Sequence, residues 1–166
     1  SNPNAIGIKA KVAIVETCGV LTMPKRIPFV ANDDTTQYYI DDDIVLKPGY
    51  SFKTWNFRYP KDEEPFSFEQ SGEIDQTITT IAGQFFVPGT DAKRTRNMNL
   101  LPNGEWLALY WDENNEFPYL IGEEDKAAMF RAKKMHKPKS GFIVTASGEL
   151  KDFPPFYRGT IPYVAT

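Results

Sequence analysis

The feature that most constrains the fold is a hairpin pattern in residues 104–122. Residues 106–112 are rich in aromatic and apolar side chains, residues 113–116 favour a turn, and residues 117–121 form a second aromatic-rich run. Aromatic side chains fit the pleated surface of a sheet, and a short polar loop between two such runs is typical of a β-hairpin. Residues 76–83 carry a further strand pattern, so the sequence predicts a mainly β protein.

The composition favours the same class of fold. The chain has 166 residues, and its 13 prolines and 11 glycines divide it into short elements. This length suits one globular domain, so we expect residues 1–166 to form a single β-rich domain. The net charge of -3 supplies no basic field for nucleic acid, and no apolar run approaches the ~20 residues of a membrane helix.

Further strands are expected at residues 8–15, 37–40, 44–46, 50–59, 66–69, 74–86 and 142–146. In residues 50–59 the aromatic side chains do not share one parity, which predicts a β-bulge near Thr54. In residues 74–86 the alternation predicts an apolar-leaning face with Ile74 and Ile78, and a polar face that includes Thr79 and Ile81.

One short helix is expected at residues 91–101, capped by Thr90 or Asp91 and ended by Pro102. Residues 125–136 fit two interpretations. Their composition, with an acidic start and a basic end, suits a helix, whereas the turn and strand that follow suit a hairpin strand, which we favour. Short strands separated by turns predict an antiparallel β-sandwich or a partly closed barrel with one short helix.

Acidic side chains are the first candidates for chemistry. Five aspartates with oxygen ligands suited to calcium lie near two turns: Asp33, Asp34, Asp41, Asp42 and Asp43. They lack the spacing and the glycine of a calcium-binding hand, so we interpret them as a solvated acidic face. Two acid pairs are candidates for glycoside cleavage, Glu69 with Glu73 and Glu105 with Asp112, but chance explains such pairs among many surface acids.

Nucleophilic catalysis has little support. The one histidine, His136, lies between Lys134 and Lys137, where a basic segment disfavours the imidazolium of a Ser-His-Asp triad, so we expect an exposed surface histidine. The one cysteine, Cys18, follows an apolar run and is expected to be a small core residue. We therefore assign no catalytic, cofactor-binding or metal-binding residue, and we expect a protein that is not an enzyme and needs no cofactor.

Basic and aromatic side chains are candidates for binding. A local basic stripe comprises Arg131, Lys133, Lys134, His136, Lys137 and Lys139. We interpret it as a solvated face, with docking onto an acidic partner or a nucleic-acid strand as the alternative. The aromatic residues that could stack on sugar rings are Trp55, Tyr59, Trp106, Tyr110 and Trp111.

The parity of these aromatic residues favours burial over ligand stacking. Trp106 and Tyr110 share one face of their strand, and Trp111 lies on the other. A core on one side of the sheet cannot cover both rows. We therefore expect one row to pack against another layer of the fold or against another subunit.

The order of elements in residues 74–157 resembles that of bacteriophage tail structural proteins. The resemblance rests on the strand ending Ile81-Ala82-Gly83, the short helix, the hairpin of residues 106–122, and the strand of residues 142–148 followed by Pro154-Pro155-Phe156-Tyr157. These features are similar to tail-tube and baseplate-type β-barrel subunits from phages and prophages of gut Bacteroidetes. Residues 1–73 lie outside the resemblance.

The resemblance implies a non-enzymatic subunit that assembles into a ring or tube. Its partners would be copies of itself and other tail proteins, with no small-molecule substrate, no membrane and no nucleic acid. Its location would be the virion, or the bacterial cytoplasm during assembly. The alternative is a carbohydrate- or protein-binding β-sandwich at a bacterial surface or secreted, for which an exposed aromatic face would be the signature.

Overall fold

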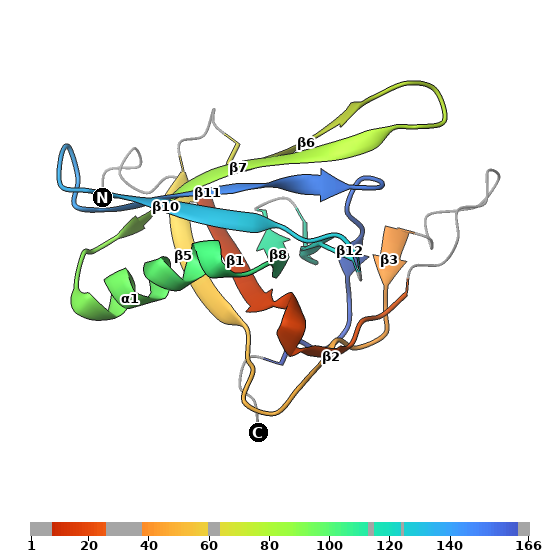
Figure 1. Ribbon diagram of the computed structural model, residues 1–166, viewed down its shortest axis with the longest axis horizontal. Helices are drawn as coiled ribbons and strands as arrows, with labels where there is room; N and C mark the ends of the chain where they lie inside the picture. The colour runs from red at the N-terminus through yellow and green to blue at the C-terminus, as the bar shows by residue number, and fades with distance from the viewer. Residues whose placement is uncertain (1–7, 26–37, 60–63, 113–114, 124, 163–166) are drawn as a thin grey trace.

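The computed structural model describes residues 8–25, 38–59, 64–112, 115–123 and 125–162. The chain is mainly β, with one short α-helix and sheets that do not close into a barrel. Figure 1 shows a long, nearly flat sheet lying across a second sheet whose strands run in a different direction. The predicted mainly β fold with one short helix is therefore confirmed, as a sandwich-like arrangement.

The larger sheet has six strands in the order β3-β12-β9-β8-β1-β5. These strands are β3 (Tyr39–Ile40), β12 (Phe156–Tyr157), β9 (Tyr119–Ile121), β8 (Trp106–Trp111), β1 (Ile8–Glu16) and β5 (Lys53–Tyr59). The predicted hairpin of residues 106–121 is confirmed, because β8 and β9 pair antiparallel with Tyr110 opposite Tyr119.

The second sheet has four antiparallel strands in the order β10-β11-β7-β6. They are β10 (Met129–Met135), β11 (Gly141–Leu150), β7 (Ile78–Pro88) and β6 (Phe66–Ser71). The strand interpretation of residues 125–136 is thus correct from Met129 onward. A small two-stranded sheet joins β2 (Val20–Thr22) to β4 (Val45–Leu46).

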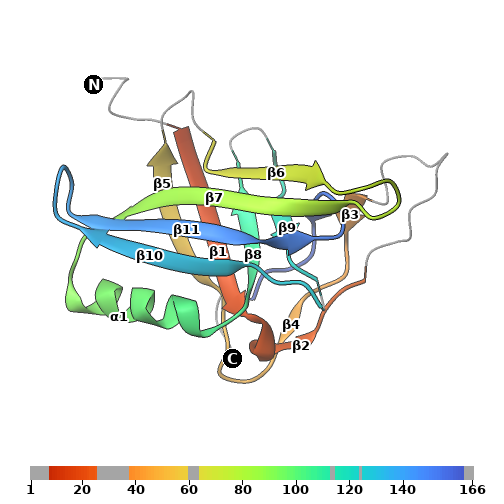
Figure 2. The same ribbon diagram turned by 45° about the horizontal axis from the view of Figure 1, so that its top comes forward.

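Helix α1 (Ala92–Leu100) follows β7 and runs beneath β10 (Figure 2). Asp91 occupies the N-cap position as predicted, but its side chain accepts a hydrogen bond from Arg94 Nη1 at 2.6 Å instead of capping the backbone. A 3-10 turn at Leu101–Asn103, which contains Pro102, ends the helix. The indole Nε1 of Trp106 donates to Leu101 O at 2.8 Å and holds this turn against β8.

The central strands of the six-stranded sheet are buried on both faces. On β8, Trp106, Ala108 and Tyr110 face the four-stranded sheet. The alternate residues Leu107 and Leu109 face a second cluster. Near-continuous apolar runs are typical of such strands, and the second layer that covers them lies within the same chain.

The second cluster is built from short segments. Ile40, Ile44, Phe52 and Tyr157 pack on the far face of the six-stranded sheet. This cluster also explains why the aromatic side chains of residues 50–59 do not share one face of the strand. Phe52 packs in this cluster, whereas Phe57 packs in the cluster between the two large sheets. The predicted bulge near Thr54 is wrong, since β1 and β5 pair in an unbroken register from Ile14–Lys53 to Ile8–Tyr59.

The predicted faces of β7 are also reversed. Thr79, Ile81, Phe85 and Val87 are buried, whereas Thr80 is exposed and Ile74 lies in the turn before the strand with 91% of its surface exposed. The aromatic residues of β6 and β7 explain this outcome. Phe66 and Phe85 stack with ring centroids 6.1 Å apart beneath the sheet, and this contact selects the buried face.

Tyr157 ties the C-terminal segment to the second cluster. Its side chain is 1% exposed, its hydroxyl accepts a hydrogen bond from Ile44 N at 2.9 Å, and it donates one to Thr160 O at 2.6 Å. Burial raises the pKa of the Tyr157 hydroxyl. The hydroxyl therefore satisfies two backbone groups.

The first prediction is that Tyr157→Phe lowers the free energy of unfolding by about 1–3 kcal/mol, because it leaves a buried N–H and a carbonyl without their partner. Urea unfolding followed by circular dichroism measures this change. Tyr38→Phe is the matched control, because Tyr38 is 42% exposed and the change there should stay within about 0.5 kcal/mol. Equal stability of the Tyr157→Phe variant and the unmodified protein would contradict the assigned role.

Candidate functional site

The four-stranded sheet ends in two edge strands, β6 on one side and β10 on the other. Within the part of the chain that the structure describes, no further strand pairs with β6. Beside β10, Trp106 of β8 bridges Ala128, the residue before the strand, and helix α1 runs alongside. An open edge presents backbone N–H and C=O groups that can pair with another strand. These two edges are the candidate functional surfaces.

The hydrogen-bonding residues of the β6 edge follow from one contact. Gln84 N donates to Pro65 O at 2.7 Å, so Pro65 and Gln84 face each other across the β6–β7 pair. In an antiparallel ladder the backbone groups of successive residues point to opposite sides. The groups of Phe66, Phe68 and Gln70 therefore point to the open edge.

The bridge between Ala128 and Trp106 shows which backbone groups of β10 point away from β11. Ala128 and Trp106 exchange two backbone hydrogen bonds, each 2.9 Å, on the side of the strand away from β11. By alternation, Phe130, Ala132 and Lys134 direct their backbone groups to that side too.

The side chains on the two edges carry opposite charge. On β6 the exposed charged residue is Glu69, and Glu73 follows in the turn. On β10, Arg131, Lys133 and Lys134 are exposed. Arg131 and Lys133 lie on the outer face, whereas Lys134 lies on the helix side, where its Nζ is 3.2 Å from Thr95 Oγ1. Three residues of the predicted basic stripe therefore lie on one edge strand of the sheet, and the other edge strand carries Glu69.

The outer face of this sheet is polar along its middle. Thr80, Ala82 and Gln84 on β7 are exposed beside Ser147 and Thr145 on β11. Small polar side chains leave this face free of a large apolar patch. The outer face of β7 and β11 can therefore remain in contact with water along these residues.

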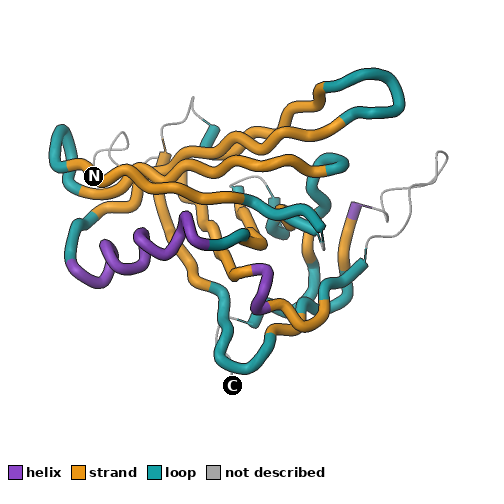
Figure 3. The backbone as a smooth tube through the Cα atoms, in the orientation of Figure 1, coloured by secondary structure: helices purple, strands orange, loops and turns teal. Residues whose placement is uncertain are grey.

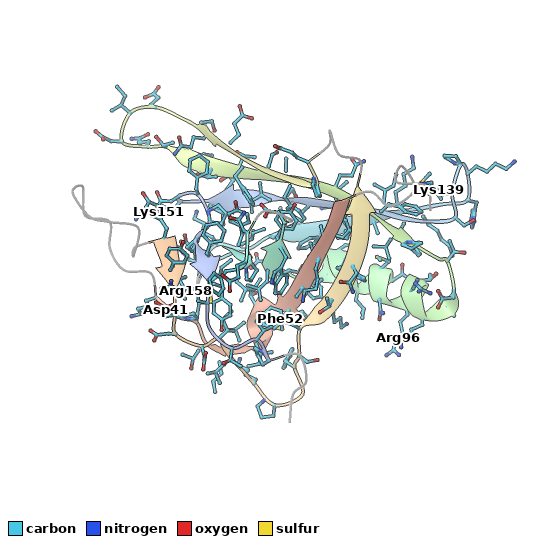
Figure 4. All side chains as sticks on the ribbon, turned by 180° about the vertical axis from the view of Figure 1, so that it is seen from behind. Asp41, Phe52, Arg96, Lys139, Lys151 and Arg158 are labelled. Carbon is cyan, nitrogen blue, oxygen red and sulfur yellow. The ribbon has the colours of Figure 1, made fainter. Side chains whose placement is uncertain are left out.

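Two of the five aspartates that we interpreted as a solvated acidic face, Asp41 and Asp43, have hydrogen-bond partners within the chain. Asp33 and Asp34 fall outside the described residues. Asp41 accepts two hydrogen bonds from Arg158, at 2.6 and 2.8 Å, and the two side chains lie side by side in Figure 4. Asp43 accepts a hydrogen bond from Thr160 N at 2.7 Å. Among the described residues, no group of three His, Cys, Asp or Glu side chains is placed to hold a metal ion.

The acid pair Glu105 and Asp112 is too widely separated for a glycosidase site in this fold. Glu105 precedes β8 and Asp112 follows it, so the length of the strand, roughly 20 Å, separates them. Glycosidases need a separation of about 5–9.5 Å. Glu69 and Glu73 both lie on exposed parts of the β6–β7 hairpin.

His136 is exposed as predicted, in the β10–β11 turn. The prediction for Cys18 is wrong, because its side chain is exposed. Strand β1 ends at Glu16, and a 3-10 turn at Thr17–Gly19 directs Cys18 outward while Gly19 packs against the ring of Tyr50. The Cys18 thiol donates to Glu16 Oε2 at 3.5 Å and lies 3.8 Å from the Tyr50 hydroxyl, and this contact with Cys18 raises the pKa of Tyr50.

The five candidate sugar-stacking residues do not form one exposed face. Trp106 and Tyr110 are buried under the four-stranded sheet, and Trp55 is half-buried against Phe85. Trp111 lies on the opposite face of β8, with Lys11 Nζ 4.0 Å from its ring centroid. The side chain of Tyr59 falls outside the described residues.

Tyr110 joins a chain of ring contacts with aromatic residues that the sequence analysis did not single out. Tyr39 stacks on Phe156, Phe156 on Tyr119, Tyr119 on Tyr110, and Tyr110 lies 4.6 Å from Phe66. Phe66 belongs to β6, so this chain joins the two sheets. The aromatic content thus serves mainly to hold the layers together.

No described helix has the length and apolar character that crossing a bilayer requires. Comparisons of the chain with protein-family models, with curated proteins and with solved structures give no significant match.

The second prediction concerns the exposed pair Asp41–Arg158. A hydrogen bond from Arg158 holds the pKa of Asp41 below its usual value, so the ionised carboxylate is favoured in the folded state. The stabilisation is present above the ordinary pKa of about 3.9 and is lost as the pH falls through the lowered value. In Arg158→Gln the pKa of Asp41 should return towards about 3.9, as measured by NMR titration of the side-chain carboxyl carbons.

The control is Arg94→Gln, which removes the partner that lowers the pKa of Asp91 and leaves the partner of Asp41 in place. The stability difference between the unmodified protein and Arg158→Gln should shrink on acidification. A pKa of Asp41 that is the same in both proteins would show that the pair does not form in solution.

Proposed function

We propose that this protein is a non-enzymatic structural subunit of a phage or phage-like tail that assembles with copies of itself into a ring or tube. The observation that carries the proposal is that the two edge strands of one antiparallel sheet, β6 and β10, carry side chains of opposite charge. The resemblance of residues 74–157 to tail subunits supplies the biological setting.

The two edges fit each other residue by residue. If Phe68 of one copy lies opposite Ala132 of the next, the outward-pointing groups of both strands meet along the whole of β6 and β10. In this register Glu69 faces Arg131 directly, and Lys133 is its diagonal neighbour. Side chains that face the core in one copy face the core in the other, so neither strand has to turn over.

The number of strands is compatible with indefinite repetition. The sheet holds four strands in strict antiparallel order, so β6 and β10 run in opposite directions. A copy added in the same orientation therefore places its β10 antiparallel to the β6 of its neighbour. Contacts of this head-to-tail kind produce rings when the rotation closes and filaments when it does not.

The stagger of the edges favours a closed, tilted sheet. β6 pairs with residues 78–83 of β7, whereas β10, through β11, lies level with residues 82–88. In the register that places Phe68 opposite Ala132, each added copy shifts the pairing by four residues, or ~13 Å along the strands, over four interstrand spacings of ~19 Å in total. This ratio corresponds to a tilt of about 35°, at the lower end of the roughly 35–45° of closed barrels.

The position of the remaining mass decides which face would line such a ring. The six-stranded sheet and α1 lie on the inner face of the four-stranded sheet (Figure 1). A ring closed through β6 and β10 has room for this mass only on its outside. The polar face with Thr80, Gln84 and Thr145 would then line the opening.

Sedimentation velocity, light scattering and negative-stain imaging over a range of protein concentrations test the proposal. We expect a discrete oligomer of several copies that appears as rings or short tubes. A protein that stays monomeric at every concentration and salt level, also when co-expressed with its gene neighbours, would rule the proposal out.

The third prediction uses proline to block one edge. Gln70→Pro removes an N–H that points to the open edge and keeps the β6–β7 hydrogen bonds, so assembly should be lost while the melting temperature stays within about 3 °C. Gln70→Ala controls for loss of the side chain and should assemble normally.

Ser71→Pro supplies the opposite comparison. The N–H of Ser71 points towards β7, so proline there should break a native hydrogen bond and lower the melting temperature. Assembly of Gln70→Pro at the level of the unmodified protein would show that the β6 edge is not a contact.

A further inference from the structure

The β6–β7 hairpin carries an unusually exposed apolar residue at its tip. Residues 69–77, which we term the arm, extend beyond the rest of the sheet (Figure 3). Ile74 lies at its turn with 91% of its surface exposed. Glu73 and Asp75 flank it, and Gln76 N donates to Glu73 O at 3.0 Å, so the turn has a defined backbone.

An exposed isoleucine side chain adds no hydrophobic stabilisation to the isolated chain. Burial of an isoleucine side chain is worth about 1.5–3 kcal/mol, and none of that stabilisation is realised by Ile74 in a single copy. The arm contains no basic residue between Glu69 and Thr77. The tip is therefore an apolar anchor within an acidic surface.

The opposite end of the same sheet has the complementary character. The β10–β11 turn and the end of β10, residues 133–139, which we term the basic hairpin, hold Lys133, Lys134, His136, Lys137 and Lys139, all exposed. Arg96 of α1 lies at the same end (Figure 4). Between these charges the outer face carries the cross-strand pair Phe86 and Ile143, both half-buried, and Lys139 Nζ is 5.9 Å from the Phe86 ring centroid.

Strand pairing sets the distance between the two ends. Ser71 pairs with Ile78 at the start of β7, and Gly141 pairs with Pro88 at its end. β7 therefore separates the arm from the basic hairpin by about 35 Å along the strand direction. A contact between them cannot form within one copy.

We propose that the arm of one copy docks on the basic hairpin of a second copy displaced along the strands. Ile74 packs on the apolar pair Phe86 and Ile143, and Glu73 and Asp75 meet Lys137 and Lys139. This contact rests on the proposed assembly and adds a direction to it: β6 and β10 join copies side by side, whereas the arm stacks one layer on the next.

A second copy fits this surface better than a different partner does. The acidic anchor and the basic acceptor occur once each on every copy, at opposite ends of one rigid sheet, so one contact repeats without limit. The charges on each end repel their own kind, which disfavours arm-to-arm and hairpin-to-hairpin contacts.

The experiment compares three variants with the unmodified protein by negative-stain imaging and sedimentation. Glu73→Lys/Asp75→Lys makes the arm basic like the hairpin, and Lys137→Glu/Lys139→Glu removes the net positive charge of the basic hairpin. Both variants should form rings, with tubes shortened by about tenfold or more. The third variant combines all four substitutions, exchanges the charges between the ends and should restore tubes. Ile74→Ser should shorten tubes without affecting rings.

The outcomes separate this contact from the lateral one. Tubes of unchanged length in both charge variants, with rings intact, would overturn the arm contact and leave the proposed function standing. Absence of rings in the unmodified protein would instead count against the proposed function. Tubes shortened only by the hairpin variant, and only before nuclease treatment, would assign the basic hairpin to nucleic acid and overturn the arm contact. Stacked layers should also separate in salt before rings do, because the contact is largely electrostatic.

Discussion

The structure depends on burial of the central strands β1 and β8 on both faces. Val12 and Ile14 pack towards the four-stranded sheet, while Ala13 and Val15 pack towards the cluster that contains Tyr157. A strand with no wet face needs cover on two sides, and this chain supplies both covers itself. The short segments around β2, β3, β4 and β12 exist to complete the second cover.

That demand leaves the four-stranded sheet as the outer layer. Its inner face is committed to the core through Phe85, Phe130 and Val144, so its outer face and its two edges meet solvent. The aromatic residues of β8 that suggested a contact with another subunit pack within the chain. The proposed assembly therefore rests on the rim of the outer sheet.

Local signals predicted the local parts of this fold. The β8–β9 hairpin and helix α1 join neighbouring segments, so turn, capping and alternation patterns were enough to find them. The pattern of residues 125–136 fitted a helix as well as a strand, and the structure shows a strand from Met129. The buried face of β7 was not predictable in this way, because the stacking of Phe85 with Phe66 decides it across two strands. The prediction that Cys18 is buried was wrong for a related reason. The 3-10 turn Thr17–Gly19, which contains Cys18, follows the end of strand β1 and turns the side chain outward.

The sequence showed only one of the two charged edges of the candidate surface. The basic stripe of residues 131–139 is contiguous in sequence, but its acidic counterpart on β6 is about 60 residues away and becomes the opposite edge only because β7 and β11 pair between them. Strand order of this kind is a long-range property, which composition and periodicity do not report.

The charge difference between β6 and β10 also governs which wrong complexes are avoided. Two copies that met through β10 would bring Arg131 and Lys133 against the same residues of the partner, and two β6 edges would place Glu69 against Glu69. Symmetric dimers, which would close off both chains as dead ends, are therefore disfavoured at each edge. Lysine on an open strand is also a common protection against uncontrolled aggregation. In the proposed assembly, the same few side chains would thus oppose symmetric pairing and leave one direction of growth open.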